Sequence, residues 1–345
     1  MGAGHVQRCL ALADGLRTRG AKVTFVTRAH PGHLAETIVE RGHAVRLLPP
    51  GDTPQAGRPD GWLGRPDVDD AAETCTVLRG VCPDWLVVDH YGSTTAWQRH
   101  TRAAAKRLLV IDDLMAHVHE ADVLLNQNRA DAEAVYRRQH LIAPSCVVLA
   151  GPTFGLLRPE FLEARRQWPR VIGPVGRVLI ALGGTDPDRR AARVLDALRG
   201  VLPAETRVQV VCGVADAGHD AVVCGAASGR WPWALEVALG VREMGRVLAH
   251  ADLGVGAAGS SSWERCCVGL PSVAIVLADN QRGPADTLRA AGAAHVIDAA
   301  DLDAHLGPAV AALFDDAGAR RDMMARGQAL VDGQGVARVA SAMAA

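Results

Sequence analysis

The run Arg177-Val178-Leu179-Ile180-Ala181-Leu182-Gly183-Gly184-Thr185-Asp186-Pro187 combines a buried strand, a glycine turn and the start of a helix. Apolar residues 178–182 suit a strand that is covered on both faces, and the two glycines permit a tight turn. Asp186 followed by Pro187 is typical of a helix N-cap and first helical residue. A strand followed directly by a turn and a helix is the repeating unit of a parallel α/β sheet.

The same unit recurs on both sides of this run. Strands are predicted at residues 22–27, 44–48, 85–88, 107–111, 123–128, 146–149, 208–211, 253–255 and 272–276, and helices at residues 6–19 and 33–41. This alternation predicts an α/β protein of two Rossmann-like domains that face a central cleft. We expect an N-terminal domain at residues 1–155, an interdomain segment at 156–176 and a C-terminal domain at 177–345.

The composition narrows the class of protein. The chain has 345 residues, 49% of them hydrophobic, which is enough for two cores. A net charge of −1 does not indicate a basic surface that would bind nucleic acid. The eight cysteines form no C-x-x-C pattern, which favours a reducing compartment. With no signal peptide and no apolar run of transmembrane length, we expect a cytoplasmic monomer that is not inserted in a membrane and binds no metal or cofactor.

The chain opens with another glycine loop, Gly2-Ala3-Gly4-His5, which leads straight into a helical pattern. The positive end of a helix disfavours imidazolium, so we expect His5 to stay neutral and able to act as a general base. The alternative is a histidine that only caps a surface helix. A Rossmann-like domain would place its first strand before this loop, and the sequence shows none there. We therefore expect that strand to be missing, the neighbouring strand edges to be unpaired, and the true start to lie upstream.

A loop of small residues precedes the helix predicted near Trp263. Backbone N–H groups at this helix start, with the hydroxyl groups of Ser260, Ser261 and Ser262, could hold a pyrophosphate, and Glu264 could accept hydrogen bonds from a ribose. The alternative is a capping motif, in which a serine caps the helix and a glutamate favours its first turn.

Three further segments follow predicted strands. The turn at Gly184 is a second candidate phosphate loop, or only a tight turn capped by Asp186. Asn280-Gln281 could hold a sugar hydroxyl or a phosphate oxygen, although asparagine is common in loops. Asp112-Asp113 is compatible with a metal site, but neighbouring carboxylates on a strand end point in opposite directions, so we expect one of them to cap the next helix.

Ten segments, in this order, resemble the UDP-2,4-diacetamido-2,4,6-trideoxy-β-L-altropyranose hydrolases of pseudaminic acid biosynthesis, which have a glycosyltransferase-B-like fold. The resemblance covers nearly the whole chain. The residues that carry it are Gly2-x-Gly4-His5-Val6-x-Arg8-Cys9-Leu10-x-Leu12-Ala13, Trp62-Leu63-Gly64, Val88-Asp89-His90-Tyr91-Gly92, Ile111-Asp112-Asp113-Leu114, Leu125-Asn126-Gln127-Asn128, Gly151-Pro152-Thr153-Phe154, Leu157-Arg158-Pro159-Glu160-Phe161, Leu182-Gly183-Gly184-Thr185-Asp186-Pro187, Trp263-Glu264-Arg265-Cys266-Cys267-Val268-Gly269-Leu270-Pro271 and Asn280-Gln281.

The resemblance implies hydrolysis at the anomeric carbon of a UDP-sugar, with inversion and release of UDP. It implies that His5 activates the attacking water. It implies that Tyr91 and the loop at Asp89 contact the sugar ring, and that Asn280 and Gln281 hold sugar or phosphate. Ser261, Ser262 and the amide region of Gly259 would bind pyrophosphate, Glu264 would bind ribose, and the main chain near Met244 would bind uracil. Gly4, Arg8, Gly184 and Ser260 complete the expected substrate-binding set.

Two other functions stay open on the sequence. A nucleotide-sugar glycosyltransferase of similar fold would need an acceptor site and, in many cases, an apolar and basic surface on the first domain. A UDP-sugar-binding protein without catalysis is compatible with the missing strand, because His5 would then lie on a frayed terminus.

Overall fold

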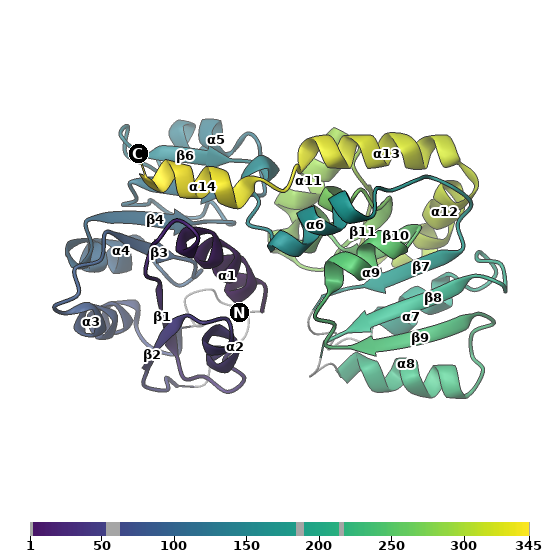
Figure 1. Ribbon diagram of the computed structural model, residues 1–345, viewed down its shortest axis with the longest axis horizontal. Helices are drawn as coiled ribbons and strands as arrows, with labels where there is room; N and C mark the ends of the chain where they lie inside the picture. Colours follow the sequence, from purple (N-terminus) through teal and green to yellow (C-terminus); the bar gives the residue numbers. More distant parts are fainter. Residues whose placement is uncertain (1–2, 53–62, 184–189, 214–216, 345) are drawn as a thin grey trace. The chain divides into compact units, whose positions relative to one another are not determined.

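The computed structural model describes residues 3–52, 63–183, 190–213 and 217–344. These residues form two compact units. The first unit holds residues 3–156 together with the C-terminal stretch that begins at Gln334, and the second unit runs from Leu157 to Gly333. Each unit is built of parallel strands and covering helices (Figure 1), as the sequence predicts.

The strands of the first unit form two parallel sheets. β1 (Thr24–Arg28) pairs with β2 (Ala44–Leu48), in a register that sets Thr24 opposite Ala44. The second sheet has the order β3-β4-β5-β6, made of β3 (Trp85–Val88), β4 (Arg107–Ile111), β5 (Val123–Asn126) and β6 (Val147–Ala150). Among the described residues no strand joins β1 to β3, so the two sheets are separate.

Helices cover both faces of the four-stranded sheet. Alternate residues of β4 point to opposite faces, as the strand period of two requires. Leu109 and Ile111 pack with Leu12 of α1 (Ala3–Arg17) and Met343 of α14 (Gly335–Ala344). The opposite face packs against α3 (Asp67–Leu78), α4 (Thr95–Thr101) and α5 (Ala132–Arg138). The remaining helical elements of this unit are α2 (Ala35–Glu40), η2 (Arg102–Ala104) and η3 (Pro152–Phe154).

The second unit contains a six-stranded parallel sheet of order β12-β11-β10-β7-β8-β9. Its strands are β7 (Arg177–Ala181), β8 (Arg207–Cys212), β9 (Ala234–Leu239), β10 (Leu253–Ala257), β11 (Ser272–Val276) and β12 (His295–Asp298). The sequence did not predict β9 and β12. These are the two edge strands, and edge strands lack the continuous apolar run that marks β10 and β11 as buried on both faces.

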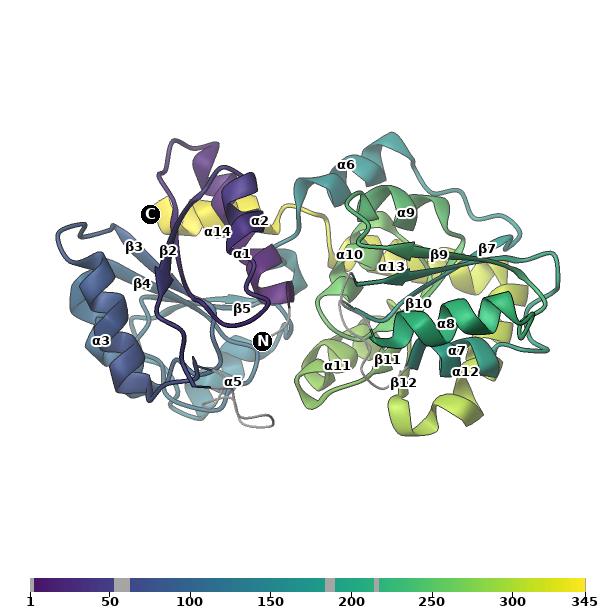
Figure 2. The ribbon, with the colours of Figure 1, turned by 90° about the horizontal axis from the view of Figure 1, so that it is seen from below.

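Two helical layers enclose this sheet (Figure 2). One face packs against α7 (Arg190–Ala197), α8 (Ala217–Ala227) and α12 (Leu302–Asp315). The other packs against α6 (Pro159–Gln167), α9 (Met244–His250), α10 (Ser261–Val268) and α11 (Arg282–Ala291), and α13 (Ala317–Leu330) lies against α10. The short turns η4 (Asp279–Gln281) and η5 (Ala299–Asp301) follow β11 and β12.

The division of the chain differs from the predicted boundaries at two places. Residues 334–345 were assigned to the second domain, but α14 packs in the first unit, where the Nε1 of Trp85 donates a hydrogen bond to the Met343 carbonyl at 2.9 Å. Residues 157–176, predicted as an interdomain segment, belong to the second unit, where Phe161 of α6 is fully buried. Both differences arise because these helices carry apolar faces that need a core.

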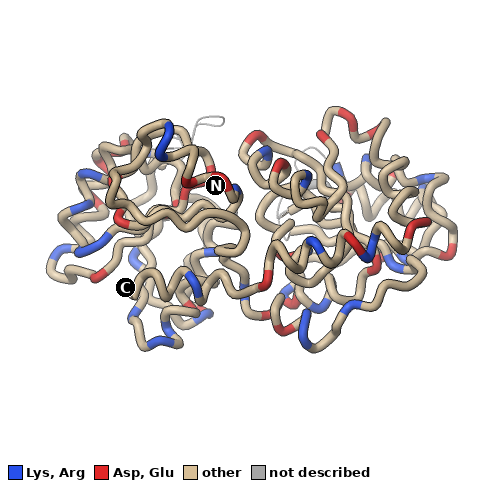
Figure 3. The backbone as a smooth tube through the Cα atoms, turned by 90° about the horizontal axis from the view of Figure 1, so that it is seen from above, with Lys and Arg blue, Asp and Glu red and all other residues tan. Residues whose placement is uncertain are grey.

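Acidic and basic residues are interspersed over each unit (Figure 3), in keeping with the nearly balanced charge of the chain. None of the helices in the described ranges is long and apolar enough to cross a membrane.

Candidate functional site

His5 and Asp89 form the centre of a polar cluster in the first unit. His5 lies in the first turn of α1, and Asp89 directly follows the last residue of β3. The Nδ1 of His5 lies 2.7 Å from the Oδ1 of Asp89. The side chain of Asp89 is 3% exposed and that of His5 is 14% exposed, so the imidazole keeps an edge open to solvent while the carboxylate is enclosed.

Arg8 lies one helical turn after His5 and joins two carboxylates. Its Nε and Nη2 donate to Asp89 at 2.7 and 2.6 Å, and its Nη1 and Nη2 donate to Asp113 at 3.0 and 2.8 Å. Burial opposes ionisation of Asp89, but the charge of Arg8 and the hydrogen bonds from Arg8 and His5 outweigh it and hold the pKa of Asp89 well below its usual range. Asp89 is therefore ionised at neutral pH.

This ionised carboxylate fixes the tautomer of His5. A carboxylate can only accept, so the Nδ1 of His5 carries the proton that it donates to Asp89. The Nη2 of Arg8 also lies near Nδ1, but at 3.3 Å the contact is much longer than the 2.7 Å contact with Asp89. In neutral His5 the Nε2 then holds the free lone pair, which a general base requires.

Tyr91 and Asn128 complete the cluster around Asp113. The hydroxyl of Tyr91 donates to one oxygen of Asp113 at 2.7 Å, and the Nδ2 of Asn128 donates to the other at 2.6 Å. The ring of Tyr91 stands edge-on to His5, with 4.7 Å between the ring centroids. The predicted sugar contact Tyr91 is thus a direct neighbour of the candidate base.

The two adjacent carboxylates point in opposite directions, as predicted, but the prediction that one of them caps the next helix is wrong, because β5 follows this loop and the next helix, α5, begins at Ala132. Asp113 faces Arg8, whereas Asp112 is buried and accepts from the backbone N–H groups of Leu114 and Met115, each at 2.9 Å. Asp112 also accepts from the hydroxyl of Tyr136 at 2.6 Å. Across the described ranges, no group of three or more acidic, histidine or cysteine side chains could hold a metal ion.

Asp89 and Arg8 are both predicted to bind the substrate. The structure shows that their side chains are enclosed and form an ion pair, and that Arg8 also pairs with Asp113. Gly4 is exposed in the first turn of α1. Asp113 and Asn128 are not among the predicted site residues. The sequence signal that could have identified them is the set of acidic and amide residues that follow β3, β4 and β5.

In the second unit, the segment after β10 forms the predicted turn into α10. Ser260 occupies the N-cap position, but its side chain makes no capping hydrogen bond, which argues against the simple capping motif. Ser262 is 1% exposed and its hydroxyl faces inward, donating to the Ala257 carbonyl at 3.2 Å. Gly259, Ser260 and half-buried Ser261 are the members of this loop that remain accessible from outside.

The structure brings Gln281 next to this loop. Its Oε1 accepts from the backbone N–H of Leu277 at 2.9 Å, which fixes the amide group. A Cβ added to Gly259 would lie 3.7 Å from the Nε2 of Gln281, so this donor group borders the loop. Asn280 is exposed in the same short turn, η4. Two predicted phosphate-binding segments therefore meet at the carboxyl ends of β10 and β11.

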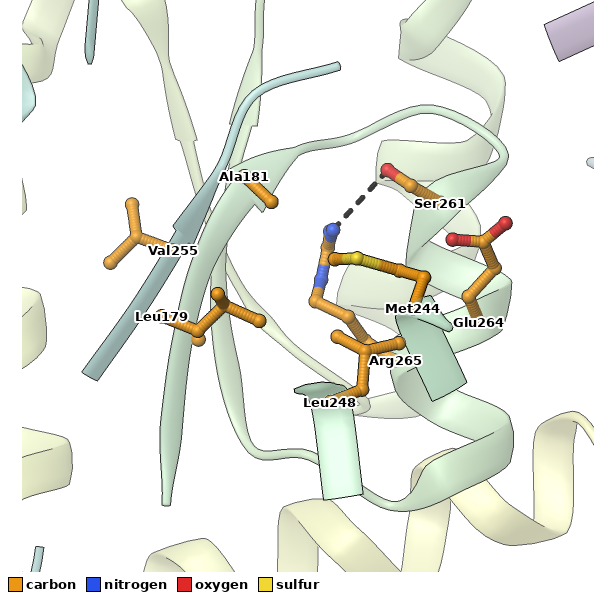
Figure 4. Close-up of a pocket in the computed structure, with 9 residues that line it drawn as sticks. Leu179, Ala181, Met244, Leu248, Val255, Ser261, Glu264 and Arg265 are labelled. Atoms are coloured by element: carbon orange, nitrogen blue, oxygen red, sulfur yellow. Dashed lines mark hydrogen bonds between the residues drawn. The ribbon is translucent and has the colours of Figure 1, made fainter. Parts of the chain in front are cut away.

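Met244 and Glu264 line one small cavity with Ser261 and Arg265 (Figure 4). Its volume of about 20 Å³ has room for roughly one water molecule. Burial raises the pKa of Glu264 to about 7, although the charges of Arg158 and Arg265 act in the opposite direction. The structure thus gathers the predicted pyrophosphate, ribose and uracil contacts on α9 and α10. The predicted residues Gly2, Trp62, Gly184, Thr185, Asp186 and Pro187 lie outside the described residues.

Comparisons with known proteins agree on the architecture. No family model matches the chain. It is 23% identical to the spore coat polysaccharide biosynthesis protein SpsG of Bacillus subtilis (strain 168), over 98% of this chain and 93% of that protein. It is 28% identical to the UDP-N-acetylglucosamine--N-acetylmuramyl-(pentapeptide) pyrophosphoryl-undecaprenol N-acetylglucosamine transferase of Salinibacter ruber (strain DSM 13855 / M31), over 88% of this chain and 83% of that protein.

The crystal structure of Acinetobacter baumannii MurG superimposes with a TM-score of 0.69 at 15% identity, covering 99% of this chain and 97% of that one. The chain has the glycosyltransferase-B fold. In open parallel α/β sheets such as those of the glycosyltransferase-B fold, ligands bind beyond the carboxyl ends of the strands. Asp89 and Asp113 follow β3 and β4 in the first unit, and the Gly259 loop follows β10 in the second, so both clusters lie at these ends.

Proposed function

We propose that this chain hydrolyses UDP-2,4-diacetamido-2,4,6-trideoxy-β-L-altropyranose and releases UDP and the free sugar with inversion at the anomeric carbon. The observation that carries the proposal is the pair of His5 and Asp89, with a contact of 2.7 Å that leaves the Nε2 of His5 free to accept a proton. The glycosyltransferase-B fold, and the ordered motifs that resemble such hydrolases, support the choice of substrate class.

In this reaction the Nε2 of His5 takes a proton from a water molecule while the water oxygen attacks the anomeric carbon. The bond from that carbon to the β-phosphate oxygen breaks, and UDP leaves with the electron pair. The imidazolium that forms is stabilised by ionised Asp89, which Arg8 holds in place. A positioned general base contributes roughly 10²–10⁴-fold to the rate of such a step.

The Gly259 loop and α10 supply the groups for the leaving group. Backbone N–H groups at the first turn of α10 and the amide of Gln281 can donate to a diphosphate, and they stabilise its negative charge as it leaves. Glu264 can accept from ribose hydroxyl groups. The name of the Salinibacter relative contains a UDP-sugar, which supports uridine diphosphate as the nucleotide that this chain binds.

Glycosyl transfer is the second candidate function. The name of the Salinibacter relative favours it, since that protein is a transferase. His5 could deprotonate an acceptor hydroxyl by the same geometry that activates water, so the cluster alone does not choose between the two.

One experiment separates these functions. Purified protein is incubated with the UDP-sugar in the absence of any acceptor, and the products are followed by proton and phosphorus NMR. We expect stoichiometric UDP and free sugar, with the first-formed anomer of inverted configuration. Release of UDP only after an acceptor alcohol is added would show that the protein is a transferase and not a hydrolase. Binding of the UDP-sugar without turnover would refute both functions.

A further inference from the structure

Arg265 lies inside the second unit, directly behind the loop that carries Ser261 and Ser262. It sits one helical turn into α10 and is 3% exposed. Its Nη2 donates to the Ala257 carbonyl at 2.8 Å and to the Ser262 hydroxyl at 2.9 Å, and its Nη1 donates to the Ser261 hydroxyl at 3.3 Å. Figure 4 shows the guanidinium group directed toward Ser261. Arg265 thus connects the end of β10 to the first turn of α10.

The absence of a side chain at Gly256 leaves space for this guanidinium group. A Cβ added to Gly256 of β10 would lie 2.5 Å from the Nη1 of Arg265 and 2.7 Å from the Ala181 carbonyl oxygen. Any other residue at this position would therefore displace the guanidinium or the neighbouring strand. The close approach of Arg265 to β10 depends on the missing side chain of Gly256.

Arg265 forms no ion pair within the described part of the chain, although the charge of the neighbouring Glu264 acts on it. Its hydrogen-bond partners there are three neutral oxygens, and its buried Nε has no partner. Arg8, by contrast, is paired with two carboxylates. The neighbouring Glu264 has a pKa raised to about 7 by burial, so at neutral pH it is ionised only in part. An enclosed cation without a counter-charge is costly, and such a site favours an anion.

We propose that Arg265 is a positioning residue for the diphosphate of the bound nucleotide. It holds the hydroxyl groups of Ser261 and Ser262 in place and supplies positive charge from behind the loop. The N-terminus of α10 adds its own N–H groups and partial positive charge in front. This inference rests on the proposed function for the identity of the nucleotide.

The test compares two ligands that differ only in the diphosphate. Dissociation constants for UDP and for uridine are measured by calorimetry for the wild type and for Arg265→Gln. We expect the preference for UDP over uridine to fall about tenfold or more, because a unit charge at close range in a protein interior is worth at least that factor. Uridine affinity should fall less than UDP affinity, and the part of the loss that both ligands share comes from Glu264, whose pKa the Arg265 charge lowers in the wild type. The matched control is Arg193→Gln, an exposed arginine of the same unit that pairs with Asp303.

Arg265→Lys keeps the charge but cannot bind three oxygens in the same geometry. We expect its preference for UDP to lie between those of the wild type and Arg265→Gln. If circular dichroism shows that Arg265→Gln is unfolded, the inference is tested on Arg265→Lys instead. Its preference for UDP over uridine should then fall about threefold or more relative to the wild type. An unchanged preference, or an equal loss of UDP and uridine affinity, would overturn the inference and leave Arg265 a structural residue. A wild type that binds UDP but hydrolyses nothing would refute the proposed function while leaving this comparison valid.

Discussion

The Nδ1 of His5 and the Oδ1 of Asp89 lie 2.7 Å apart, although 84 positions separate them in the chain. The contact exists because α1 packs on the sheet that contains β3, so the first turn of the helix meets the residue after the strand. Its chemical consequence is a fixed tautomer, with the proton on Nδ1 and the lone pair on Nε2.

Replacing His5 by alanine should remove the base without affecting the nucleotide site. We expect His5→Ala to lower the rate of UDP release about 10²–10⁴-fold, since that is the contribution of a positioned general base. The dissociation constant for UDP should change less than twofold, because the proposed nucleotide contacts lie in the second unit. A coupled assay for UDP and calorimetry measure the two quantities.

The matched control for this substitution is His100→Ala, which removes an exposed histidine of the same unit. It should retain the wild-type rate. Turnover of His5→Ala within about twofold of the wild type would remove His5 from the mechanism.

Asp89 and Asp113 offer a matched pair of substitutions, since both carboxylates bind Arg8 and, of the two, Asp89 is the one that contacts His5. In Asp89→Asn the amide can donate to Nδ1 and stabilise the wrong tautomer, so we expect kcat to fall about 10²-fold or more. Asp113→Asn should keep the tautomer and lose less than about tenfold, with part of the effect in KM through Tyr91.

Each substitution should also lower the free energy of unfolding by about 1–3 kcal/mol, because Arg8 loses one charged partner in a buried site. Urea unfolding measures this cost. Equal losses of kcat in the two variants would mean that Asp89 acts only through the stability of the cluster.

Much of the fold follows from local sequence, whereas the polar cluster does not. Apolar runs such as residues 253–255 predict strands because buried parallel strands need apolar residues on both faces. The pairing of Arg8 with Asp89 and Asp113 depends on which helix meets which strand end, and local patterns carry no information about that. The sequence therefore predicts His5 as the base and Asp89 and Arg8 as substrate contacts, but not the hydrogen bonds that join the three side chains.

The burial of Arg265 in the second unit also cannot be predicted from local sequence. An arginine in a short helix is normally expected at the surface, where its charge is hydrated. Its burial depends on the space left by Gly256 on the neighbouring strand. Such a pair of residues can be recognised only when the packing of α10 on β10 is known.

Acid should destabilise the first unit through Asp112. Burial raises the pKa of this carboxyl, but the hydrogen bond and charge of His119 outweigh burial and lower the pKa to about 2. A carboxyl with a lowered folded pKa contributes stability above its unfolded pKa of about 4, and the contribution is lost as the pH falls toward 2. We expect a loss of about 2 kcal/mol from this group over that window.

Urea unfolding between pH 5 and pH 2 measures the effect. Asp112→Asn should be less stable at pH 7 and should lose less stability over the acid window, whereas the exposed Asp220→Asn should follow the wild type. A wild type and an Asp112→Asn variant with parallel pH profiles would contradict the assignment.

Glu264 should make nucleoside binding depend on pH near neutrality. Burial raises its pKa to about 7, so about half of the free protein carries the neutral acid at that pH. Ribose hydroxyl groups donate best to the ionised carboxylate, so uridine should bind more tightly as the pH rises, by up to about tenfold from pH 6 to pH 8. Uridine is the appropriate ligand because, unlike UDP, it has no phosphate that titrates in this range. Glu264→Gln should bind uridine weakly and with no pH dependence, and a wild-type affinity that is flat from pH 6 to pH 8 would exclude Glu264 as the ribose acceptor.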